Sequence, residues 1–176
     1  MFATIYLPNF FLQAVIRHRE FSESAPIALI DEQEAKPTII QLNHAAQTAG
    51  VRQGMTPSQG LARCLTLLIK PRSLMKEEAL SNLLLQYCFS LSPCVEATGP
   101  GVWTVQFTRT DHVCEKVTSV VCQLNGCEVD ARAGIAPTPD MSFLAANLAQ
   151  PVLEISDREK FLAPLSIDIL AIPFQQ

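Results

Sequence analysis

The chain has 176 residues, enough for one large domain or two small ones with a buried hydrophobic core. Its content of 48% hydrophobic and 17% charged residues is typical of a folded globular protein and argues against intrinsic disorder. No apolar run approaches the ~20 residues of a membrane helix, and the N-terminus lacks the pattern of a signal peptide. We therefore expect a cytoplasmic protein without membrane contact.

The charged residues are distributed unevenly along the chain, and the cysteines show no metal-binding or redox spacing. Residues 1–76 hold eight Lys/Arg against five Asp/Glu, whereas residues 77–176 hold five against twelve. The stretch 41–76 has no acid and five basic residues, which suits either nucleic-acid contact or an ordinary solvated surface: Arg52, Arg63, Lys70, Arg72 and Lys76. The six cysteines form no C-x-x-C pair, which favours buried, reduced thiols: Cys64, Cys88, Cys94, Cys114, Cys122 and Cys127.

The first half of the chain predicts a strand over 3–7 followed by a helix from Phe10 to about Arg19, with Pro8 at the junction. Strands at 26–30 and 38–42 follow, joined by an acidic turn over 31–34. Asn43 can cap a short helix that stops at Gly50, and Thr56-Pro57-Ser58-Gln59 starts another helix that ends before Pro71.

The second half predicts a long helix after Ser73, strands at 94–96 and 102–107, and a helix capped by Asp111. A strand over 128–136 and a helix from Thr138 to about Ala149 complete the pattern. This order gives an α+β fold, a split β-α-β-β-α-β (ferredoxin-like) sheet with a small, mostly helical insertion over 12–72.

Four short motifs occur in order along the chain: Phe10-Phe11, G-V-R-Q-G-M at 50–55, G-I-A-P-T-P at 134–139, and F-L-A-P-L at 161–165. Together they resemble the Y-family (translesion) DNA polymerases, and the second and third resemble their ImuB-like branch, regarded as non-catalytic. The resemblance implies a palm over 1–11 and 73–157, fingers over 12–72, and the start of a truncated thumb over 158–176. We therefore expect the sequence to be part of a longer protein.

The positions that carry the family's chemistry have changed. Its metal-binding acids fall on Tyr6, Gly101 and Val102, so the resemblance implies neither a bound metal nor another cofactor. The remnants of its nucleotide pocket fall on Phe11, His44, Gln47 and Pro139. Phe11 matches the residue that excludes a ribose 2′-OH, but in the absence of nucleotide binding core packing is the favoured explanation of this phenylalanine. Phosphoryl transfer needs carboxylates that hold divalent metal ions, so we expect a non-enzyme.

The first hypothesis is therefore a pseudoenzyme that acts as an adaptor in error-prone DNA repair, including translesion synthesis and damage-induced (SOS) mutagenesis. The resemblance implies three partners: a RecA-like accessory protein, a C-family DNA polymerase subunit and the sliding clamp. It also places most DNA contacts in the missing thumb and later domains, with Arg52, Arg63, Lys70 and Arg72 as candidates here. The alternatives are an active nucleotidyltransferase with relocated acids (Glu96, Glu128 and Asp130) and a protein-interaction module unrelated to DNA.

Overall fold

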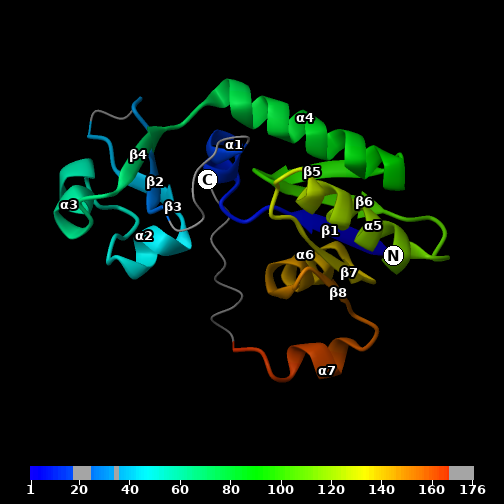
Figure 1. Cartoon of the computed structure of the whole chain (residues 1–176). Helices are drawn as coiled ribbons and strands as arrows, with labels where there is room; N and C mark the ends of the chain where they lie inside the picture. The colour runs from blue at the N-terminus through cyan, green and yellow to red at the C-terminus, as the bar shows by residue number, and fades with distance from the viewer. Residues whose placement is uncertain (18–24, 34–35, 167–176) are drawn as a thin grey trace. The chain divides into compact units, whose positions relative to one another are not determined.

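The structure is a computed structural model that describes residues 1–17, 25–33 and 36–166. The chain forms two compact units (Figure 1): unit 1 comprises Met1–Pro8 and Ser81–Gln176, and unit 2 comprises Asn9–Leu80. Unit 2 is thus inserted after the first strand of unit 1. The expected end of the first helix at 18–19, the end of the acidic turn at 34–35, and residues 167–176 lie outside the described residues.

Unit 1 is built on a five-stranded sheet in the order β5-β6-β1-β7-β8. Strand β1 lies in the middle and pairs antiparallel with both β6 and β7, as the split β-α-β-β-α-β pattern requires. The extra strand β8 pairs parallel with β7. The strands are β1 (Phe2–Tyr6), β5 (Val95–Gly99), β6 (Val102–Gln106), β7 (Arg132–Ala136) and β8 (Val152–Glu154).

Helix α4 (Leu74–Leu91) begins in unit 2 and continues into unit 1. The helices that belong wholly to unit 1 are α5 (Val113–Gly126), α6 (Pro139–Leu148) and α7 (Arg158–Leu162). Successive residues of β1 face opposite sides of the sheet. One side carries fully buried Ala3 and Ile5, whereas the other carries Thr4, whose hydroxyl lies 2.7 Å from that of Ser142 on α6. Helix α6 also lies directly on Gly134, where an added Cβ would be 2.2 Å from the backbone of α6.

Unit 2 contains a three-stranded sheet in the order β3-β2-β4 and three short helices. Strand β2 pairs antiparallel with β3 and parallel with β4. A buried apolar cluster lies between this sheet and α2: Ala28, Ile30, Ile39, Leu42, Ala46, Val51 and Leu67. The elements are α1 (Phe10–Ile16), β2 (Ile27–Ile30), β3 (Ile39–Leu42), α2 (His44–Thr48), α3 (Pro57–Arg63) and β4 (Leu68–Pro71).

Local capping residues fix the helix starts of unit 2. The Asn43 side chain accepts hydrogen bonds from the amides of Ala46 and Ile27, each at 3.0 Å, and so joins the start of α2 to the start of β2. Thr56 and Gln59 form the predicted capping box of α3. Gly50 has the positive φ, +88°, that the predicted stop after α2 requires.

Several predicted details were wrong. Helix α3 ends at Arg63, and part of the stretch expected to continue it forms β4, because parallel pairing with β2 outweighs local helix propensity. Helix α5 begins after His112, which has φ +56°, while Asp111 contacts Arg109 instead of capping. Glu128 and Asp130 precede β7, since Glu128 has φ +61° and cannot continue an extended strand.

The cysteines were also misjudged in part. All six are free thiols. Only Cys88, on the inward side of α4, is buried, whereas Cys94 and Cys122 are exposed. The exposed pair follows from position, because Cys94 precedes the edge strand β5 and Cys122 lies on the outer side of α5.

Candidate functional site

The three positions expected to have lost metal-binding acids lie together at one end of the sheet in unit 1. Tyr6, the last residue of β1, is the direct register partner of Val102 at the start of β6. The amide of Leu7 donates to the carbonyl of Gly101 at 2.9 Å, which closes the same end of this strand pair. The side chains here are a phenol, an isopropyl group and a hydrogen atom. These three positions therefore supply no carboxylate ligand.

Strand β7 brings a cation to the same place. Arg132 is the register partner of Tyr6 on the other side of β1, and directly opposed residues of antiparallel strands project to one face of a sheet. Its guanidinium is 3.6 Å from the Asp130 carboxylate, and the two side chains are 34% and 60% exposed. The Arg132 guanidinium beside this position disfavours a divalent cation, and the neighbouring Asp130 carboxylate offsets part of this repulsion.

The local charges also act on the Tyr6 hydroxyl. Burial is the main cause that raises the pKa of Tyr6 above its ordinary value of 10.0; Arg132 lowers this pKa and Asp130 raises it. The phenol therefore stays protonated at neutral pH and contributes a neutral group to the site.

Glu96 and Asp130, two of the three acids proposed as relocated ligands, are not brought together. Glu96 lies on edge strand β5, opposite Thr104, while Asp130 lies just before β7. Strands β5 and β7 are three strand spacings apart, about 14 Å, whereas two ligands of one Mg²⁺ ion each lie about 2 Å from it. Within the described ranges, no group of three or more His, Cys, Asp or Glu residues could hold a metal ion.

The expected remnants of the nucleotide pocket are distributed over both units. Pro139 is the first residue of α6, which is capped by Thr138, and it offers neither an N–H nor a charge. His44 and Gln47 are exposed on α2 in unit 2. The carbonyl of Gln47 accepts a 2.7 Å hydrogen bond from Arg52 Nη1, and both residues line an open pocket of about 450 Å³.

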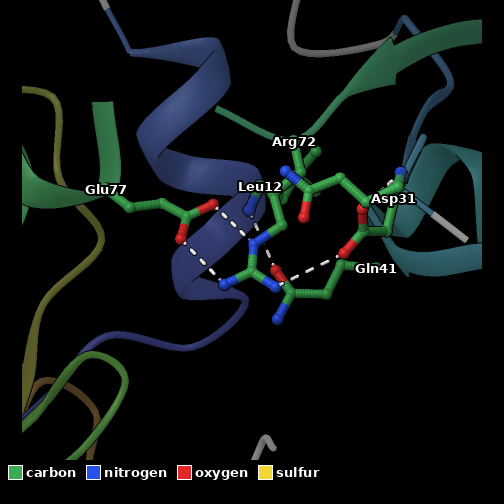
Figure 2. A network of polar contacts seen from close by, with 6 residues as sticks. Leu12, Asp31, Gln41, Arg72 and Glu77 are labelled. Atoms are coloured by element: carbon green, nitrogen blue, oxygen red, sulfur yellow. Dashed lines mark hydrogen bonds and ion pairs between the residues drawn. The ribbon is translucent and has the colours of Figure 1, made fainter. Parts of the chain in front are cut away.

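Arg72 lies in a network of polar contacts in unit 2 (Figure 2). Arg72 donates through Nε and Nη2 to the two oxygens of Glu77, at 2.8 and 3.0 Å, and its Nη1 lies 3.6 Å from Asp31. The guanidinium also lies over the Phe11 ring, 4.1 Å from its centre. These contacts to the two carboxylates raise the pKa of Arg72, with the hydrogen bond to Glu77 as the main cause.

The same cluster extends to α1 through Gln41, whose side-chain oxygen accepts a 2.9 Å hydrogen bond from the amide of Leu12. Phe11 is only 5% exposed and packs edge-on against Phe10, with ring centres 5.6 Å apart. The structure thus gives both Phe11 and Arg72 packing partners inside unit 2. Among the other basic candidates, Arg63 is exposed in the last turn of α3, and Lys70 lies on β4.

The split sheet with a unit inserted after its first strand is the fold of Y-family DNA polymerases. The structure matches an insertion ternary complex of Dbh DNA polymerase and DinB from Sulfolobus solfataricus, each with a TM-score of 0.82 and 17% identity. Both matches cover 96% of this chain, and they cover 53% and 52% of the two polymerase chains. The chain therefore spans about half the length of these polymerases.

The family follows from the sequence itself. Residues 5–147 match the impB/mucB/samB family, so the chain belongs to that family. A comparison with curated protein sequences found no match. Within the described part of the chain, no helix is long and apolar enough to cross a membrane.

Proposed function

We propose that this chain is part of a catalytically inactive Y-family homologue, similar to the ImuB-like branch, that serves as an adaptor in error-prone DNA repair. The observation that carries this proposal is the end of the sheet in unit 1, where Tyr6, Val102 and Arg132 stand side by side on three adjacent strands. In a two-metal mechanism this place must gather negative charge. Here it presents one neutral phenol, one aliphatic side chain and one guanidinium that is paired with Asp130.

The size of the effect supports inactivity. Loss of a single preorganised electrostatic contact costs about 10²–10³ in rate. This chain lacks the carboxylates at three positions, and it has exchanged the expected phosphate ligands for His44, Gln47 and Pro139. Losses of this kind act on the same transition state, so together they leave no measurable nucleotide incorporation.

Primer extension tests the proposal. The full-length protein is incubated with primer–template, all four dNTPs and either Mg²⁺ or Mn²⁺, beside an active Y-family polymerase as a positive control. We expect no extension above background with either metal. Template-dependent incorporation that disappears in a Glu96→Gln/Asp130→Asn variant would instead establish the relocated-acid enzyme.

The remaining parts of the proposal concern organisation and partners. We propose a palm over 1–11 and 73–157, fingers over 12–72, and the start of a thumb over 158–176; the proposed fingers lie within unit 2, whose bounds are wider at both ends. The adaptor would join a RecA-like accessory protein, a C-family DNA polymerase subunit and the sliding clamp at damaged DNA. Arg63 and Lys70 are the residues here that we propose to contact DNA phosphates, which would make such contacts salt-dependent. Copurification of the full-length protein with each partner, with and without DNA, tests this arrangement.

A further inference from the structure

An open pocket in unit 2 lies beside the C-terminal end of α2 and is separate from the changed site of unit 1. Its volume is about 450 Å³, and it is lined by Leu42, Gln47, Thr48, Val51, Arg52 and Gln53. Leu42 and Val51 belong to the buried cluster of unit 2 and give the pocket an apolar floor. The other four side chains are exposed and polar. The pocket therefore combines an apolar base with hydrogen-bonding walls.

Arg52 is held in place on this wall. Its Nη1 donates to the carbonyls of Gln47 at 2.7 Å and Val51 at 2.9 Å, and both bonds anchor one nitrogen of the guanidinium. Neither bond uses the Nε–Nη2 edge, which can bind both oxygens of a carboxylate at once. Because the guanidinium is already oriented, an incoming carboxylate orders fewer torsions than it would at a freely rotating lysine.

The surroundings favour an anion. Residues 36–76 contain no Asp or Glu but six basic residues: Lys36, Arg52, Arg63, Lys70, Arg72 and Lys76. Asp31 and Glu77, which lie on either side of this stretch in the sequence, both contact Arg72. The charge of Arg52 is therefore not matched by an acidic residue of its own segment.

We propose that this pocket binds a short acidic peptide segment of a partner protein. A Glu or Asp carboxylate of that segment pairs with the Nε–Nη2 edge of Arg52. The side-chain amides of Gln47 and Gln53 each offer a donor and an acceptor, which matches the N–H and C=O groups of a peptide backbone. An apolar side chain of the segment rests on the exposed edge of Leu42.

A peptide fits this lining better than a phosphate group. A phosphate offers mainly acceptors, so it makes no use of the amide oxygens of Gln47 and Gln53, and the pocket presents only one guanidinium to it. A peptide satisfies both kinds of group and adds apolar contact. This inference deepens the proposed adaptor role, because it names a surface on which a partner docks. Only the assignment of that partner to DNA repair rests on the proposed function. Its test measures binding, so its outcome is independent of primer extension.

The test is a titration of the ¹⁵N-labelled 176-residue chain, observed through the side-chain amide signals of Gln47 and Gln53. The probe is acetyl-Leu-Glu-Leu-amide, and its neutral control is acetyl-Leu-Gln-Leu-amide. We expect saturable shifts with the acidic peptide, with a Kd on the order of 1 mM for so few contacts, and at least about tenfold weaker binding of the neutral peptide.

Variants distinguish binding in the pocket from a general attraction between the acidic peptide and the basic surface. Arg52→Ala should weaken binding of the acidic peptide about tenfold, whereas Arg63→Ala, which removes an equal charge from α3, should leave it unchanged. Gln53→Ala leaves the hydrogen bonds of Arg52 to Gln47 and Val51 intact and should still weaken binding several-fold. Loss of affinity in this variant therefore cannot result from unfolding of the end of α2. Absence of shifts with the acidic peptide, or equal loss in Arg52→Ala and Arg63→Ala, would overturn the proposal. Stronger shifts of the same signals with inorganic phosphate or a deoxythymidine oligonucleotide would reassign the pocket to phosphate.

Discussion

Replacement of Arg72 by alanine should destabilise unit 2. The variant removes two charge-assisted hydrogen bonds to Glu77 and the contact with the Phe11 ring. It also leaves the Glu77 carboxylate, whose side chain is only 8% exposed, without its cation. A buried charge that loses its partner is costly because it has already lost its hydration.

The magnitude follows from these contacts. Removing one partner of a fully buried ion pair costs about 3–5 kcal/mol. Arg72 is 28% exposed, so water can reach the vacated space, and we reduce this figure to about 2–3 kcal/mol. The stacking of the guanidinium on Phe11 adds about 0.5–1 kcal/mol. The expected loss is therefore about 3 kcal/mol, which corresponds to roughly a hundredfold change in an opening equilibrium.

Hydrogen exchange is the appropriate assay, because the only tryptophan, Trp103, lies in unit 1 and cannot report on unit 2. Amides of β2, β3 and β4, together with the amide of Leu12, should exchange about a hundred times faster in Arg72→Ala. Arg63→Ala is the matched control and should change these rates less than threefold. Arg72→Ala/Glu77→Gln should recover part of the loss, since a neutral amide is easier to bury. Equal exchange in Arg72→Ala and Arg63→Ala would refute the reasoning.

Three further predictions concern unit 2 and unit 1 separately. Gly134→Ala should prevent unit 1 from folding, because the added Cβ would meet the backbone of α6; Trp103 fluorescence measures this. In Gly60→Ala the added Cβ would meet only the movable ends of side chains, at 2.9 Å. This variant should lower the free energy of unfolding by about 1–2 kcal/mol, as measured by urea unfolding. Since its pKa is raised, folded Tyr6 holds its proton more tightly than the unfolded chain, so stability should fall as pH rises above about 10, a fall that Tyr6→Phe reduces. Burial raises the pKa of Cys88 to about 12, so alkylation at pH 8 followed by mass spectrometry should label Cys94 and spare Cys88 until the chain unfolds.

The features that the sequence predicted well are those with local causes. The cap at Asn43, the capping box of Thr56 and Gln59, and the stop at Gly50 depend on residues within one helical turn, so their signals are complete in a short window. The order of the strands in unit 1 followed from alternation and turn signals. Tyr6 and Val102 are direct register partners across β1 and β6, while their assignment to a lost metal site stays a prediction.

The features that sequence analysis missed depend on distant partners. The apolar run before Pro71 suits a helix or a strand equally, and only pairing with β2 makes it β4. The same holds for Arg132. In the sequence it is an ordinary residue at the start of a strand, and only the pairing of β1 with β7 shows that it lies beside Tyr6. Arg72 was grouped with the basic patch because its partners, Asp31 and Phe11, are remote in the sequence. The one local indication of its ion pair was Glu77, which lies five residues after Arg72 in the first turn of the predicted long helix.

The central position of β1 has a consequence for the order in which the protein can form during synthesis. Thr4 makes hydrogen bonds with Thr104 and Ser142, which lie 100 and 138 residues further along the chain. Unit 2 is continuous in sequence, so a nascent chain can fold it before β6 and β7, the two strands that pair with β1, have been synthesised. A strand that is apolar on one face and unpaired at both edges is prone to non-native pairing. Unit 1 should therefore be the slow-folding part, and chaperones that cover extended apolar segments should act on residues 2–6.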